Sequence, residues 1–131
     1  MQPNTILSNR TKRLFGWIGS ICLLLIIPIK AIRWVNLSTT ANIFIGIIPS
    51  ILGPAGLLFL ILSDSRLVRL TLLQTTLFVG AIAIGLEFIQ LFPRPGILES
   101  INYTFDWLDI AASLLSVSIG YVIARFISNN N

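Results

Sequence analysis

Four long apolar segments divide this chain and limit what it can fold into. They cover residues 14–32, 43–62, 67–92 and 105–127, and a helix needs about 20 residues to cross the roughly 30 Å hydrocarbon core of a bilayer. Apolar runs of this length are typical of transmembrane helices rather than of a water-soluble domain. The sequence therefore predicts an all-α polytopic membrane protein with four transmembrane helices, folded as a single domain over residues 1–131.

The composition agrees with a membrane protein that contacts lipids. Hydrophobic residues make up 55% of the chain and charged residues 11%, whereas about 25% of the residues in globular domains are charged. The net charge of +4 does not indicate a nucleic-acid partner, because the Lys and Arg residues stand singly or in small groups beside the apolar segments.

The small number of reactive side chains excludes several kinds of site. The chain has no His and one Cys, which excludes a His-based zinc site, a Cys cluster, a Ser-His-Asp triad and an intramolecular disulfide. We therefore expect no cofactor and no resident metal. Carboxylates are the side chains left to carry any chemistry.

Cations between the apolar segments predict the orientation of the chain. With four spans both termini lie on one side, which then carries six cations: Arg10, Lys12, Arg13, Arg66, Arg69 and Arg125. The other side carries three: Lys30, Arg33 and Arg94. By the positive-inside rule the termini lie in the cytoplasm.

The second apolar segment contains helix-breaking and small residues, among them Gly46, Pro49, Gly53, Pro54 and Gly56. Neighbouring helices can satisfy the backbone groups that proline frees, and small residues let helices approach closely. We expect a kinked, closely packed transmembrane helix, with a broken or re-entrant helix as the alternative.

The third and fourth segments each carry one stripe of small and polar residues. Steps of three and four residues place side chains on one helix face. Such steps join Thr76, Gly80, Ala83, Glu87, Gln90 and Arg94 in the third segment, and Asp106, Asp109, Ser113, Ser116 and Gly120 in the fourth. Because the two spans run antiparallel, Glu87 and Gln90 are expected level with Asp109 and Ser113. The predicted polar site comprises Glu87, Gln90, Arg94, Asp106, Asp109 and Ser113.

This site has three interpretations. It is a structural polar lock between helices, a site for a lipid head group or a cation such as Mg²⁺, or a catalytic pair in which one carboxyl is a general acid and the other a base. A carboxylate costs roughly 2.5 to 3.5 kcal/mol at the centre of a membrane helix, whereas a polar pair between helices returns about 0.6 kcal/mol on average. Arg94 is either a phosphate clamp or an interfacial anchor.

The motif formed by these residues resembles that of the VanZ-like membrane proteins. Glu87-x-x-Gln90, the acidic Phe105-Asp106-Trp107-Leu108-Asp109, and the run from Ala112 to Gly120 are similar to that family's E-x-x-Q, a loop with R, and D-x-x-D-x-x-x-N-x-x-G-x-x-x-G. Ser113 and Ser116 stand where the family has Asn and the first Gly, and Tyr103 where it has Arg. The resemblance implies a multi-pass protein of the bacterial cytoplasmic membrane, in a family whose founder is linked to teicoplanin resistance and which has no agreed biochemical activity.

We therefore expect a function in the cell envelope, namely handling or sensing of a lipid-linked or glycopeptide ligand. Two alternatives belong to other classes. One is a small structural membrane subunit whose stripes bind a partner helix. The other is a carboxylate-dependent membrane hydrolase or transferase.

Overall fold

The computed structural model describes residues 8–32, 39–64, 70–89 and 107–130. In these residues the chain has no strand and forms four helices: α1 (Asn9–Ile32), α2 (Thr39–Ser63), α3 (Leu72–Ile89) and α4 (Trp107–Asn129). At 1.5 Å per residue, α1, α2 and α4 are about 34 to 38 Å long and α3 is about 27 Å long. Each is long and apolar enough to cross a membrane. The predicted all-α, four-helix membrane fold is confirmed.

The beginnings of α1 and α3 are set by capping residues. Ser8 caps α1: its hydroxyl oxygen accepts from the Arg10 N–H at 3.4 Å, and its carbonyl accepts from the Lys12 N–H at 3.0 Å. Thr71 and Gln74 form a capping box before α3, because each side chain accepts a hydrogen bond from the other residue's N–H, at 3.3 and 3.0 Å respectively. Hence α1 starts before the predicted residue 14, and α3 starts at Leu72 rather than at residue 67.

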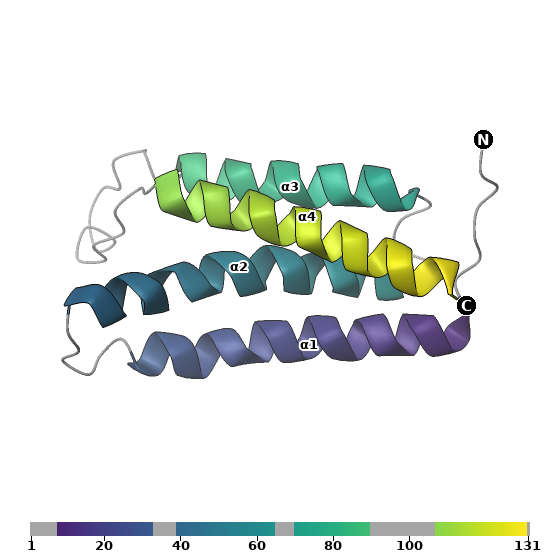
Figure 1. Cartoon of the computed structure of the whole chain (residues 1–131), viewed down its shortest axis with the longest axis horizontal. Coiled ribbons are helices and arrows are strands. Elements are labelled where there is room, and N and C mark those ends of the chain that lie inside the picture. The colour runs from purple at the N-terminus through teal and green to yellow at the C-terminus, as the bar shows by residue number, and fades with distance from the viewer. Residues whose placement is uncertain (1–7, 33–38, 65–69, 90–106, 131) are drawn as a thin grey trace.

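The helices are arranged around α2 (Figure 1). Consecutive helices run in opposite directions, so α2 and α4 are parallel to each other. Among the described residues, α1 packs almost entirely on α2, whereas α3 and α4 pack on α2 and on each other. The start of α1 and the end of α4 lie at the same end of the molecule, which we call the terminal end; the opposite end is the distal end.

The contact between α1 and α2 depends on two glycines that bring the backbones together. A Cβ atom added to Gly19 would lie 2.8 Å from the Gly56 carbonyl oxygen, and one added to Gly56 would lie 2.9 Å from the Leu23 side chain. Although it contains Pro49 and Pro54, α2 is a single helix. The expected close packing of this segment through small residues is confirmed, and the re-entrant alternative does not hold.

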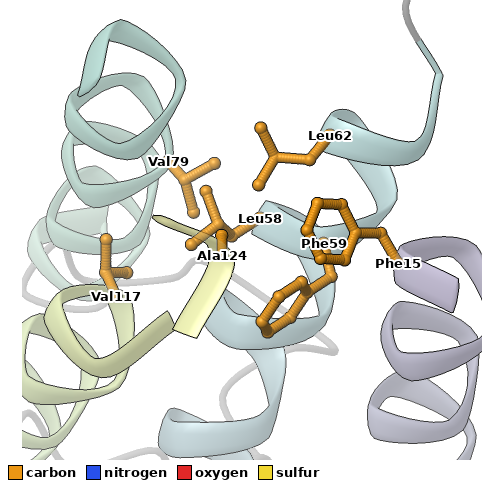
Figure 2. Packing of buried hydrophobic residues seen from close by; sticks show 7 residues of the cluster. All are labelled: Phe15, Leu58, Phe59, Leu62, Val79, Val117 and Ala124. Carbon is orange, nitrogen blue, oxygen red and sulfur yellow. The ribbon is translucent and has the colours of Figure 1, made fainter. Parts of the chain in front are cut away.

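A cluster of buried apolar side chains lies in the terminal half of the bundle (Figure 2). All four described helices contribute to it, with Phe15, Leu58, Phe59, Leu62, Val79, Val117 and Ala124. The rings of Phe15 and Phe59 are tilted by 51° with centroids 5.4 Å apart, a favourable arrangement for aromatic pairs. The apolar core therefore occupies one half of the bundle, and the distal half is held by other contacts.

The outer surface of the helices is apolar. Trp17, Leu24 and Ile27 on α1 are between 63% and 69% exposed, and each of the other helices also exposes large hydrophobic side chains. Water-soluble monomers rarely expose apolar surface on this scale. The surface fits contact with lipid chains, as expected for a multi-pass membrane protein.

Candidate functional site

The stripe of small and polar residues on α4 lies on the face that points into the bundle. Ser113 is 2% exposed and Ser116 is 5% exposed, Gly120 is buried, and Asp109 is half-buried in the first turn of the helix. An acid in the first turn interacts favourably with the positive end of the helix dipole. The predicted inward face of this stripe is confirmed from Asp109 to Gly120.

The hydrogen bonds of this stripe run to α2. Ser50 Oγ donates to Asp109 Oδ1 at 2.9 Å, and Ser113 Oγ donates to the carbonyl oxygen of Ser50 at 3.0 Å. Ser116 Oγ donates to the carbonyl oxygen of Ile51 at 2.5 Å. We call this set of three hydrogen bonds the α2–α4 polar contact. Asp109 and Ser113, which lie four residues apart on α4, thus bind the side chain and the backbone of a single residue of α2.

A proline explains why α4 binds α2 at this point. In a regular helix the carbonyl of Ser50 would accept from the N–H of residue 54, but Pro54 has no N–H. The freed carbonyl lies within a helix that is long and apolar enough to span a membrane, where a backbone acceptor needs a partner inside the protein. The Ser113 hydroxyl supplies the missing donor. The Ile51 carbonyl, one residue further along, also accepts a serine hydroxyl from α4.

The inner face of α3 carries the second predicted carboxylate. Thr76, Gly80, Ala83 and Glu87 are all buried, and Glu87 is 8% exposed. This confirms the predicted inward direction of the stripe as far as Glu87. Glu87 lies in the last turn of the described part of α3, and Asp109 lies in the first turn of α4, so both carboxylates belong to the distal half of the bundle (Figure 1). Through its bond to Ser50, Asp109 is level with the middle part of α2.

The predicted site is only partly described. Glu87, Asp109 and Ser113 are placed on α3 and α4, whereas Gln90, Arg94 and Asp106 lie outside the described residues. The stripe pattern predicts that Asp109 and Ser113 face the third helix, but the hydrogen bonds described above join them to α2. A direct meeting of Glu87 with Asp109 stays a prediction.

Ser50 is a member of the site that the stripe pattern does not identify. The neighbouring Pro49 and Pro54 indicate a kinked helix, and neither points to Ser50 as a partner for α4. A signal is nevertheless present in the sequence, since a carbonyl four residues before a proline needs a donor from elsewhere. Two serines that follow an acid on another span at steps of four and then three residues are suitable donors.

The chemistry available to this arrangement is that of a positioned carboxylate. The Ser50 hydroxyl fixes one oxygen of Asp109, and the side chain is half-buried. Within the described ranges no group of three or more His, Cys, Asp and Glu residues could hold a metal ion. The site is therefore suited to accept hydrogen bonds from, or to pair with, a polar ligand group.

Comparison of the chain with family models, with curated proteins and with solved structures found no match.

Proposed function

We propose that this chain is a VanZ-like protein of the bacterial cytoplasmic membrane that binds the polar part of a lipid-linked or glycopeptide envelope ligand in the distal half of its bundle. Asp109 is the central binding residue, and Glu87 is the second carboxylate of the site. The single observation that carries the proposal is that Asp109 is held by Ser50 and is only half-buried. A role in tolerance of glycopeptide antibiotics follows from the resemblance to the family.

We assign different roles to the residues of α4 according to their hydrogen bonds, with the serines in packing and Asp109 in ligand binding. Ser113 and Ser116 satisfy the backbone carbonyls of α2 around Pro54. Asp109 accepts a hydrogen bond from the Ser50 hydroxyl. A neutral side chain with an acceptor oxygen could accept the same bond. The helix dipole favours a charge in the first turn of α4, and a carboxylate that accepts one hydrogen bond keeps capacity to accept others. We infer that a polar group of the ligand uses this remaining capacity.

The orientation of the site in the membrane is part of this proposal. The six-to-three distribution of cations supports cytoplasmic termini. The distal end then faces the outside of the cytoplasmic membrane, where lipid-linked wall precursors and glycopeptides are accessible. Cytoplasmic termini and an external binding site therefore stand or fall together.

The test compares Asp109→Asn with Ser113→Ala. The asparagine keeps an acceptor for Ser50 and removes only the charge, so we expect normal protein level and normal unfolding but loss of co-purifying envelope head groups, measured by mass spectrometry of protein purified in native lipid. Ser113→Ala should instead lower stability and keep the head groups in the protein that remains folded. Head groups retained unchanged by Asp109→Asn would refute the binding role.

A structural membrane subunit is the second candidate. It is favoured by the observation that Asp109 and Ser113 both bind Ser50 within the chain. In that case Asp109→Asn should be harmless or stabilising, because it removes the cost of a charge and keeps the hydrogen bond. Glycopeptide tolerance of cells carrying Asp109→Asn and Glu87→Gln separates the two candidates, since only ligand binding predicts its loss at normal protein level.

A further inference from the structure

The terminal end of the bundle carries a concentration of positive charge. Arg10 and Arg13 on α1 and Arg125 on α4 are exposed, and Lys12 is half-buried beside them in sequence. Asp64, which directly follows α2, is the one acid at the terminal end among the described residues. Within the described part of the chain, four cations against one acid leave a positive surface, which we call the basic end.

The packing of the core brings the cations of α1 and α4 to the same level. Phe15 and Ala124 belong to one buried cluster, and Figure 2 shows them approaching α2 from opposite sides. Arg13 precedes Phe15 by two residues, and Arg125 follows Ala124 directly. Arg13 and Arg125 therefore lie at a similar level along the bundle, on helices that flank α2.

The electrostatics of α1 alone do not favour these cations. A helix N-terminus carries about half a positive charge, and cations in the first turn are unfavourable there. Arg10, Lys12 and Arg13 nevertheless lie in the first residues of α1, which has no acid in its first turn. An anion outside the helix would offset both the dipole and the side-chain charges.

The neighbouring side chains indicate what kind of anion fits. Trp17, one turn after Arg13, and Phe126, directly after Arg125, are each 69% exposed. Arg125 also donates from Nη1 to the Tyr121 hydroxyl at 3.4 Å. Exposed Trp and Tyr rings near cations are typical of helices at the boundary between lipid chains and head groups, and Phe126 adds exposed apolar surface next to Arg125 in the sequence. A free phosphate has no apolar part to contact these rings, whereas a phospholipid has.

We propose that the basic end binds the phosphate groups of anionic phospholipids. Arg10, Arg13 and Arg125 bind the head groups, and Trp17 and Phe126 contact the adjoining acyl chains. This role concerns the end opposite to Asp109 and does not depend on the envelope ligand.

The experiment is native mass spectrometry of the full chain with phosphatidylglycerol or phosphatidylcholine added to the detergent. The native protein should retain phosphatidylglycerol preferentially. Combined replacement of Arg10, Arg13 and Arg125 by Gln should weaken this preference by about tenfold or more, because each basic residue near a membrane surface contributes to attraction of anionic lipid. Lys30→Gln, which removes one cation at the distal end of α1, is the control and should leave the preference unchanged.

Further measurements distinguish lipid binding from binding of free phosphate and from a loss of folding. Unfolding of the triple variant in phosphatidylcholine should match that of the native protein, because the replaced side chains are exposed. Inorganic phosphate at equal ionic strength should not displace the lipid. An unchanged lipid preference in the triple variant, an equal loss in Lys30→Gln, or displacement by inorganic phosphate would each overturn the proposal.

Discussion

Ser113 donates its side-chain hydroxyl to the backbone carbonyl of Ser50 at 3.0 Å, although 63 residues separate the two serines. The bond replaces one that α2 cannot make for itself, because Pro54 has no N–H to offer. Membrane-spanning backbone groups need partners inside the protein. One helix of this bundle therefore completes the hydrogen bonding of another.

Ser113→Ala should destabilise the protein by about 1 kcal/mol, within the range of roughly 0.6 to 2 kcal/mol measured for polar contacts between membrane helices. Equilibrium unfolding in mixed micelles measures the change. Ser118→Ala is the matched control, because Ser118 is exposed and its hydroxyl donates to the Leu114 carbonyl of its own helix, at 2.8 Å. Equal stability of the two variants would contradict the role given to Ser113.

The dependence on proline is tested by repeating Ser113→Ala in a Pro54→Ala background. Alanine restores the backbone N–H, so the Ser50 carbonyl regains a partner within α2 and the serine should matter less. We expect the double-mutant cycle to show a coupling of about 0.5 kcal/mol or more. A cost for Ser113→Ala that is the same in both backgrounds would mean that Pro54 does not create the need for the hydroxyl.

Gly19→Ala should weaken the contact between α1 and α2. The new methyl group would lie 2.8 Å from both the Gly56 carbonyl oxygen and the Leu60 backbone nitrogen, and backbone atoms cannot move aside without separating the helices. Gly16→Ala is the control, since its methyl group would meet Ser63 at an ordinary 3.5 Å. Alanine favours a helix over glycine by about 1 kcal/mol in water, so Gly16→Ala should be neutral or stabilising in the same unfolding assay. Similar losses at the two positions would argue against close approach at Gly19.

Gly120→Leu should lower stability and expression. Even a methyl group at this position would lie 2.8 Å from Cδ2 of Leu58, which is fully buried. Overpacking of this kind typically costs about 1 to 3 kcal/mol. Ile119→Leu changes a side chain that is 50% exposed and should be tolerated. Thermal aggregation of detergent-solubilised protein compares the two variants, and an equally stable Gly120→Leu would show that α4 is free to move away from Leu58.

The proposed orientation predicts how single cysteines react in intact cells. Thr40 and Asn130 are exposed at the distal and terminal ends, so Thr40→Cys should react with an impermeant thiol reagent and Asn130→Cys should react only after the membrane is opened. Both are placed in a Cys22→Ser background to remove the native thiol. The reverse labelling pattern would place the termini outside the cytoplasm.

The helices and their inward faces were predictable from the sequence because both follow from local patterns. Apolar length identified the four spans, and steps of three and four residues identified the faces on which Glu87, Ser113 and Ser116 are buried. The helix starts were less predictable, since hydropathy does not register the capping roles of Ser8 and Thr71.

The partner of the α4 stripe was not predictable from periodicity. A helical repeat shows which side of a helix faces inward but does not show which neighbour lies there. Chain order favours α3, the helix that precedes α4 in sequence. The hydroxyl groups bind α2 instead, because Pro54 leaves a backbone acceptor there. A search for acceptors four residues before each proline would have included Ser50 among its candidates.

The long sequence separation within the α2–α4 polar contact has a consequence for biosynthesis. Translation completes α2 well before Ser113 and Ser116 emerge from the ribosome, so α2 enters the membrane with the Ser50 carbonyl still lacking its final donor. Before α4 is synthesised, exposure of this carbonyl to lipid would be unfavourable. The carbonyl therefore needs contact with water or with the insertion machinery at that stage. Arrival of the last helix supplies the donor that the Ser50 carbonyl lacks until then.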